Sequence, residues 1–148
     1  MEDSKILKIK KLLYDLSKEE VISIISNTDD LELLYTYLYN YNWDDGFEIP
    51  QIILDKDRCD LSTALLAFYG ADGVSYLLNK LGNENLPKWH VFIKKLYNFI
   101  LNRKYIKGQI AFKIPLSKMQ IFKLKKILSD DEAIFIKDIL GENLDISL

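Results

Sequence analysis

The order of apolar and polar residues along the chain predicts a series of short helices. Apolar side chains recur at helical spacing between lysines over residues 4–16. Further on, a serine or aspartate stands three residues before a glutamate or glutamine at several helix starts, which is the capping-box pattern. These pairs are Ser17 with Glu20, Asp29 with Glu32, Ser117 with Gln120, and Ser129 with Glu132. We therefore expect a helix to begin at each of these pairs.

The segment 42–73 separates the helices that precede it from those that follow. Its first residues, Asn-Trp-Asp-Asp-Gly at 42–46, must end the apolar helix predicted over 31–41, because Asn and Gly tolerate the left-handed conformation that stops a helix. Pro50 suits the first turn of the next helix, which Asp45 or Glu48 would cap and which would end near residue 57.

Two more helices are predicted after this turn. Asp60 is a good N-cap for a helix over 61–69 that Gly70 ends. Asp72 restarts the chain for a further helix that ends at Gly82.

The longest predicted helix begins at Pro87 and runs to about residue 103, with aromatic and aliphatic side chains on its buried stripe. Beyond it, Ile110, Phe112 and Ile114 alternate with other residues as they would in a strand. Residues 105–114 would then form one small β-hairpin. Extended coil is an equal alternative, because an isolated hairpin is only marginally stable.

Taken together, these elements predict a mainly α fold. We expect about eight short helices in stacked antiparallel pairs, an α–α array, with the small hairpin near 105–114 as its only β-structure. The chain has no fixed-period repeat, so a regular solenoid is not expected. At 148 residues it has the length of a single domain, 1–148, that can bury a substantial core.

Composition places the chain among ordinary globular proteins. Hydrophobic residues make up 49% and charged residues 28%, which argues against disorder. The single cysteine cannot form an internal disulfide, so a reducing cytoplasm is the expected location. The amphipathic N-terminus indicates no signal peptide, and no apolar run is long enough to cross a membrane. No membrane partner is therefore expected.

Charge is distributed unevenly, although the formal net charge is only −2. Acidic residues dominate 29–60, where only Lys56 and Arg58 oppose them. Residues 86–129 contain no acid. The bases in that stretch are Lys88, Lys94, Lys95, Arg103, Lys104, Lys107, Lys113, Lys118, Lys123, Lys125 and Lys126. Such a distribution influences the choice of partner more than the fold.

Part of the chain resembles a bacterial family, domain of unknown function 4274. The resemblance lies in the turn at 42–46 and in a set of residues that follows it: Pro50, Cys59-Asp60, Thr63-Ala64-Leu65, Phe68-Tyr69 and Ala71-Asp72-Gly73. A weaker likeness continues over 104–128. The resemblance implies a small bacterial protein that often stands alone and is similar to the immunity partners of toxin–immunity systems. It implies no catalytic residues.

The acidic cluster supports more than one kind of site. As a surface for a cognate toxin protein, it would use Asp44, Asp45, Glu48, Asp57 and Asp60. The same carboxylates around Asp44, Asp45 and Asp60 would suit an enzyme with an acidic site, if they converge in a pocket. Helix caps and solvated turns explain most of these acids better than a metal or acid–base site does. Their spacing does not match a calcium loop, and we predict no metal, no cofactor and no catalytic residue.

Other reactive residues are isolated. His90 is the only histidine and lies within the longest helix, without a serine elbow nearby. Cys59 is expected to be a small buried residue before a cap rather than a reactive thiol. No glycine-rich phosphate loop and no paired zinc-ligand spacing is present.

Nucleic acid is an alternative partner. The basic stretch 88–126 interleaves lysines with aromatic residues that would stack on bases. Most of these aromatics fall on apolar stripes, however, and would belong to the core. We therefore rank an immunity-type binding protein first, a nucleic-acid-binding protein second and an enzyme third.

Trp43 is expected to pack rather than to bind a ligand. It stands between the terminating Asn42 and a turn, where a large aromatic ring can seal the loop to neighbouring helices. If Trp43 is well buried, its replacement by alanine should cost about 3–5 kcal/mol.

Overall fold

The computed structural model describes residues 1–148 and contains eight α-helices and two 3-10 helices. The fold is mainly α, as predicted, and its only β-type contacts are isolated bridges. The chain folds as two compact units. The first unit consists of Met1–Cys59 with Leu144–Leu148, and the second unit consists of Asp60–Asn143. The single domain expected over 1–148 stays a prediction.

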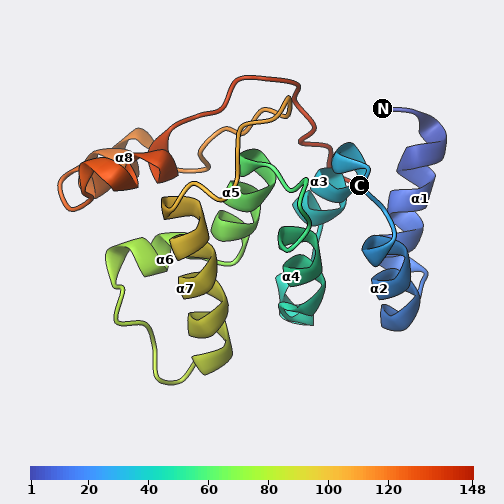
Figure 1. The fold of residues 1–148 in the computed structure, drawn as a ribbon, viewed down its shortest axis with the longest axis horizontal. Coiled ribbons are helices and arrows are strands. Elements are labelled where there is room, and N and C mark those ends of the chain that lie inside the picture. Colours follow the sequence, from blue (N-terminus) through green and yellow to red (C-terminus); the bar gives the residue numbers. More distant parts are fainter. The chain divides into compact units, whose positions relative to one another are not determined.

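In the first unit, each helix packs mainly against the next helix but one in the chain. Its elements are α1 (Asp3–Tyr14), α2 (Lys18–Ser26), α3 (Leu31–Tyr39), η1 (Trp43–Asp45) and α4 (Glu48–Leu54). The closest packing joins α1 to α3 and α2 to α4, so it connects alternate rather than consecutive helices (Figure 1). Helix α3 is buried almost all round, from Leu33 to Leu38, and forms the centre of this unit.

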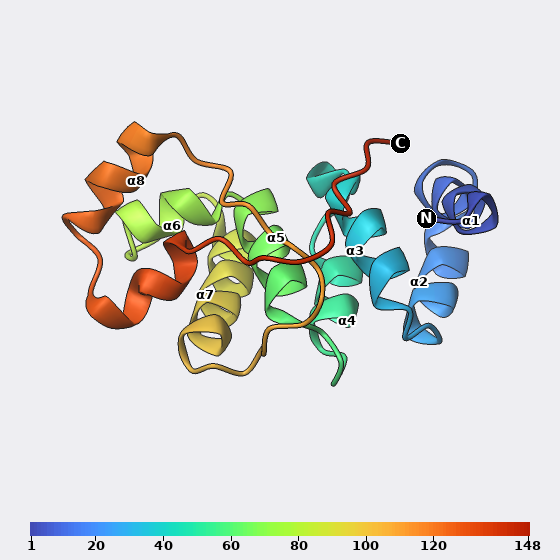
Figure 2. The ribbon, with the colours of Figure 1, turned by 90° about the horizontal axis from the view of Figure 1, so that it is seen from above.

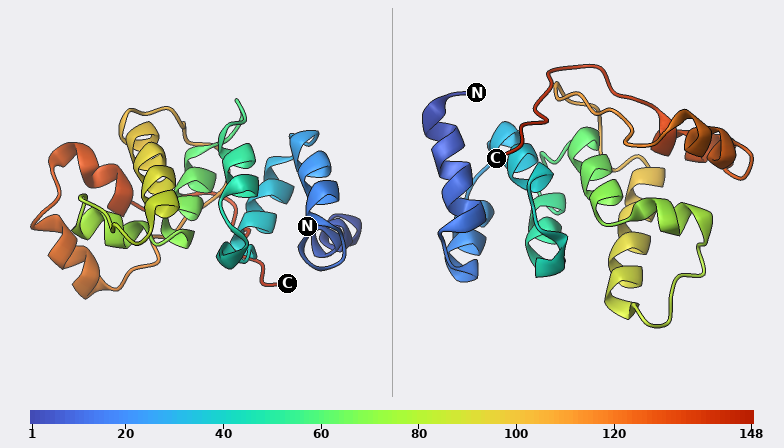
Figure 3. Two further views of the ribbon diagram at one scale, coloured as in Figure 1. Left: turned by 90° about the horizontal axis from the view of Figure 1, so that it is seen from below. Right: turned by 180° about the vertical axis from the view of Figure 1, so that it is seen from behind.

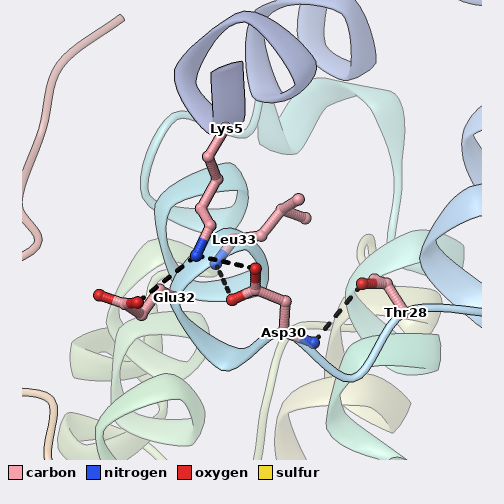
Figure 4. A network of polar contacts seen from close by, with 5 residues as sticks. All are labelled: Lys5, Thr28, Asp30, Glu32 and Leu33. Atoms are coloured by element: carbon pink, nitrogen blue, oxygen red, sulfur yellow. Dashed lines mark hydrogen bonds and ion pairs between the residues drawn. The ribbon is translucent and has the colours of Figure 1, made fainter. Parts of the chain in front are cut away.

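A polar contact fixes α1 to the start of α3 (Figure 4). Lys5 Nζ lies 2.9 Å from Asp30 Oδ2 and 3.4 Å from Glu32 Oε1. Asp30 Oδ1 also accepts a hydrogen bond from the Leu33 N–H at 3.2 Å, so one carboxylate caps α3 and holds α1. The hydrogen bond to Asp30 raises the pKa of Lys5, which keeps the ammonium charged in this position.

The last residues of the chain return to the first unit (Figure 1). The Tyr35 hydroxyl donates to Asp145 Oδ1 at 2.7 Å, and Asn40 Nδ2 donates to the Ile146 carbonyl at 2.7 Å. The Tyr14 hydroxyl donates to the Leu148 carbonyl at 2.7 Å. Segment Leu144–Leu148 therefore satisfies polar groups on α1 and α3.

The second unit has an aromatic core between its helices. Its elements are α5 (Leu61–Gly70), α6 (Gly73–Leu78), α7 (Pro87–Leu101), α8 (Lys118–Lys125) and η2 (Asp130–Ile136). Helix α7 packs against α5, α6 and η2 (Figure 2). The Phe135 ring lies 4.9 Å from the Phe68 ring and 5.0 Å from the Tyr97 ring, which joins η2 to α5 and α7. No helix of either unit has the length and apolar character needed to span a bilayer.

The β-hairpin considered for 105–114 does not form. Phe112 exchanges backbone hydrogen bonds with Ile139, and the Ala111 N–H donates to the Glu142 carbonyl at 2.8 Å. Residues 109–112 follow α7, and residues 139–142 follow η2. These two segments run beside each other in Figure 3. The Ser62 hydroxyl also donates to the Ile110 carbonyl at 2.6 Å. Distant partners thus satisfy the backbone groups that a local hairpin would have paired.

Several predicted helix starts are confirmed. Ser17 and Ser117 cap α2 and α8 with full capping boxes, and Asp60 caps α5 through the Thr63 N–H at 2.9 Å. Pro87 begins the longest helix, α7. The element that follows Ser129 is a 3-10 helix rather than an α-helix.

Other predicted boundaries are wrong. Asp30, not Asp29, caps α3, because its carboxylate reaches the Leu33 N–H. Helix α4 has no side-chain cap, since Glu48 lies inside its first turn rather than before it. Helix α6 ends at Leu78, before Gly82. Gly82 has φ +78°, and a Cβ there would come within 2.3 Å of the His90 ring, so glycine is needed for the loop to pass over α7.

Glu132 is a buried carboxylate that connects three parts of the second unit. Its Oε2 accepts from the Tyr97 hydroxyl at 2.7 Å and pairs with Lys80 Nζ at 2.8 Å. Its Oε1 accepts from both the N–H and the hydroxyl of Ser129 at 3.1 Å. Burial alone would raise the pKa of Glu132, but the bonds from Lys80, Tyr97 and Ser129 prevail and lower it to about 2.

We expect Glu132→Gln to destabilise the protein by about 3 kcal/mol at neutral pH. The folded-state pKa lies below the ordinary value of 4.5, so this contribution is present above pH 4.5 and is lost as the pH falls towards 2. Urea unfolding of both proteins across this range measures the difference. The exposed Glu84→Gln serves as the control. A difference that does not shrink with acidification would contradict the assignment.

Candidate functional site

An exposed acidic turn lies between α3 and α4 in the first unit. Its residues form η1, in which the Asn42 side chain accepts from the Asp44 N–H at 3.1 Å and the Asn42 carbonyl accepts from the Asp45 N–H at 3.0 Å. Gly46 follows with φ +96°, a backbone conformation that strongly favours glycine. The local sequence therefore fixes the turn and leaves both aspartate side chains outside it.

Aromatic side chains of Tyr41, Trp43 and Phe47 pack together at the turn. The Trp43 ring meets the Tyr41 ring edge-on at 5.2 Å and lies 6.4 Å from the Phe47 ring. The Tyr41 hydroxyl donates to the Gly46 carbonyl at 2.6 Å, which closes the turn onto the end of α3. Trp43 is a packing residue, as expected, but its side chain is only partly buried.

The carboxylates of this turn differ in their pairing. Asp44 and Asp45 are exposed, and neither forms an ion pair. Glu48 Oε2 lies 2.8 Å from Lys18 Nζ, with both side chains more than half exposed (60% and 55%). Such an exposed pair adds little stability. We call Asp44, Asp45 and Glu48 the acidic surface.

The two remaining predicted contact residues lie elsewhere. Asp57 is exposed in the turn after α4, at the opposite end of that helix from Glu48. Asp60 belongs to the second unit, is only 4% exposed and caps α5. Because a buried cap offers no surface to a partner, we leave Asp60 out of the acidic surface.

A cleft of about 330 Å³ opens beside the acidic surface within the first unit. Its lining includes the exposed Asn42 and Asp45 and the buried Tyr37 and Tyr41. The remaining lining residues come from α1, α2, the linker between them, the end of α3 and α4: Leu12, Leu13, Tyr14, Leu16, Lys18, Val21, Asn40 and Ile49. Sequence reasoning missed this cleft, because its walls come from segments that helical periodicity assigns simply to the core.

Burial and the acidic residues act together on the two tyrosines of this cleft. Burial, with the charges of Asp45 and Glu48, raises the pKa of Tyr41 to about 12. Burial, with the effects of Tyr41 and Asp45, also raises the pKa of Tyr37. Both tyrosines thus lie in desolvated surroundings next to negative charge.

The carboxylates considered for an enzyme have different surroundings. Asp44 and Asp45 are exposed on η1, whereas Asp60 is a buried helix cap. No group of three or more His, Cys, Asp and Glu side chains is placed to hold a metal ion. Cys59 is buried immediately before the Asp60 cap, as expected. His90 is partly buried beneath Gly82, and its Nε2 makes no hydrogen bond.

The basic side chains between residues 86 and 129 are exposed along the whole stretch. Every lysine and arginine between 86 and 129 is exposed, and none forms an ion pair. The aromatics among them are mostly in the core, including Phe92, Tyr97 and Phe112. Phe122 on α8 differs from them, because its side chain is 56% exposed. Lys126 Nζ lies 4.5 Å from the centre of the Phe122 ring.

A second cleft, of about 410 Å³, lies in the second unit beside η2. Arg103, Lys107 and Lys137 line it together with Asp130 and Asp138, so its charges are mixed. Arg103 has φ +63°, and its guanidinium donates to the carbonyls of Leu101 and Asp131. These bonds hold the end of α7 to η2 and give Arg103 a structural role.

Comparison with known families identifies the central part of the chain. Residues 29–101 match the model of the family described as "Domain of unknown function (DUF4274)". This part of the chain is a DUF4274 domain. The DUF4274 match includes α3, η1, α4, α5, α6 and α7, and thus the whole acidic turn. The weaker likeness suggested for 104–128 lies outside it. No curated protein and no solved structure shows a significant match.

We expect Trp43→Ala to destabilise this DUF4274-containing protein by about 1–2 kcal/mol. The reason is that a partly buried indole loses one edge-on aromatic contact and part of its buried area, rather than a complete core position. This is less than the 3–5 kcal/mol of a fully buried site. Urea unfolding measures the change. A loss above about 3 kcal/mol, or one within 0.5 kcal/mol, would show that the packing of Trp43 has been misjudged.

Proposed function

We propose that this protein is an immunity-type binding protein, which blocks a cognate bacterial toxin domain by covering a basic surface of that toxin. The observation that carries the proposal is the state of Asp44 and Asp45. Both carboxylates are exposed without an ion pair, on a turn that is already held by Asn42, Gly46 and the Tyr41 hydroxyl. A partner would therefore meet charges that need little further ordering.

The charges of the turn and its place in the chain support the same proposal. Unpaired surface charges that are not used for stability are available for steering a partner of opposite charge. The turn lies inside the family match, whereas the basic stretch extends beyond it. We infer that the acidic surface carries binding and that Lys123, Lys125 and Lys126 serve another face. A cytoplasmic location is part of this proposal.

The decisive test compares two matched sets of charge-removing changes. We expect Asp44→Asn with Asp45→Asn to weaken binding to the product of the adjacent gene by about tenfold, because two steering charges are lost. Both positions are exposed, so thermal unfolding should be nearly unchanged. Surface plasmon resonance should show most of the change in the association rate.

The control is Lys123→Gln with Lys125→Gln and Lys126→Gln on the basic side. We expect it to leave that binding within about twofold, a change well below 1 kcal/mol. The site assignment fails if the lysine variant abolishes binding and the aspartate variant does not. The proposed function is wrong if the adjacent gene product does not bind this protein and remains toxic in its presence.

Nucleic-acid binding is the second candidate, because the lysines and arginines between residues 86 and 129 are exposed and form no ion pair. Its weakness is that the aromatics needed for stacking are mostly buried. Filter binding with short single- and double-stranded DNA and RNA tests it. If this function is correct, affinity falls steeply with salt, and the lysine variant weakens binding. An absence of affinity at low salt would remove this candidate.

A further inference from the structure

We call the cleft beside the acidic surface the slot. Its lining includes the partly exposed Leu13 and Leu16 and the buried Ile49, Tyr37 and Tyr41. The rings of these two tyrosines lie 5.9 Å apart. Its volume of about 330 Å³ is at the lower end of the range for ligand sites, which suits one long side chain and not a large cofactor.

The charges at the slot select the type of side chain. Asp45 lines the slot and forms no ion pair, and Glu48 stands at the start of α4, next to the lining residue Ile49. The only cation in the lining is Lys18, whose ammonium is held 2.8 Å from Glu48. The chain's own lysine thus already pairs with a carboxylate beside the slot. Lys18 is more than half exposed and leaves the Asp45 carboxylate unpaired.

We propose that this cleft receives an arginine side chain of the basic partner, which deepens the proposed function and rests on it. The aliphatic part of the arginine would lie along the partly exposed Leu13 and Leu16. Its guanidinium would meet the exposed Asp45 carboxylate. Arginine fits this chemistry better than lysine, because a planar guanidinium can bind a carboxylate through two parallel hydrogen bonds and is more weakly hydrated than an ammonium.

Lys18 is a competitor in this arrangement. Its pairing with Glu48 neutralises part of the negative potential that an incoming guanidinium would use. Removing Lys18 should therefore strengthen the binding of arginine, whereas removing the Asp45 charge should weaken it. A surface that simply attracts cations through long-range charge would respond in the same directions, so the test must also alter the shape of the slot.

The experiment uses the full chain, labelled with ¹⁵N, and needs no toxin. It is titrated with N-acetylarginine amide and followed by the amide resonances of Tyr41, Asn42 and Asp45. N-acetyllysine amide and uncharged N-acetylnorleucine amide are the matched probes. We expect the arginine probe to shift these resonances with saturation, the lysine probe to bind more weakly, and the norleucine probe to have little effect.

Three variants separate charge from shape. Lys18→Met should tighten binding of the arginine probe, and Asp45→Asn should weaken it, each by about 1.5- to 5-fold, the range of one exposed ion pair. Leu13→Trp fills the slot and keeps every carboxylate, and it should abolish saturable binding. Leu13→Met keeps the slot open and should retain binding, while thermal unfolding checks that both Leu13 variants are folded.

The outcomes separate this inference from the proposed function. Saturable binding that survives Leu13→Trp would show a diffuse charge effect and overturn the slot. Equal binding of all three probes, or no shift at the named amides, would overturn it as well. A different result is that the arginine probe shows no binding although the Asp44→Asn, Asp45→Asn variant still loses toxin binding. That result would support the proposed function and rule out the slot. If the probe binds as expected and no toxin does, the slot stands as a guanidinium site.

Discussion

The buried carboxylate of Glu132 determines how the second unit is assembled. It receives hydrogen bonds from Ser129 at the start of η2 and from Tyr97 on α7, and it pairs with Lys80 after α6. A buried carboxylate costs much free energy unless each of its oxygens is satisfied. Its partners are therefore held in one arrangement, and that arrangement places Phe135 against Phe68 and Tyr97 in the core. In the first unit, Asp30 has the same dual task, because it caps α3 and binds Lys5.

These structural carboxylates make the acidic surface easier to interpret. Asp30, Asp60 and Glu132 are each used by a helix start, whereas Asp44 and Asp45 project from a turn whose own hydrogen bonds come from Asn42 and Tyr41. A charge that contributes to no cap and to no ion pair adds little to stability. It is consequently free to act on a partner, and this contrast is the physical basis of the proposed function and of the arginine slot.

The parts of the fold that could be predicted depend on local chemistry. Ser17, Ser117 and Pro87 mark helix starts because their side chains or ring act within one turn. The failures involve distant partners. Residues 109–112 pair with 139–142 instead of forming a hairpin, and no local pattern specifies that choice. Asp30 rather than Asp29 caps α3, a difference of one residue in the helix start. The ion pair of Asp30 with Lys5 joins two helices, so the local pattern does not predict it.

The candidate site was predicted only in part for the same reason. The turn chemistry of 42–46 identified Asp44 and Asp45, and their exposure followed from it. The partial burial of Trp43 and the capping role of Asp60 depend on how surrounding elements pack. The cleft lined by Leu13, Tyr37 and Asp45 combines residues from separate helices, so no single stretch of sequence carries a signal for it.

The return of Leu144–Leu148 to the first unit has a consequence for protein synthesis. The second unit is inserted, in sequence, between the two parts of the first. A ribosome therefore releases α1 to α4 long before it releases the residues that satisfy Tyr35, Asn40 and Tyr14. Domains commonly fold in the order of their synthesis. Here all residues of the second unit are synthesised before Leu144–Leu148. The first unit is therefore synthesised first but completes its structure last.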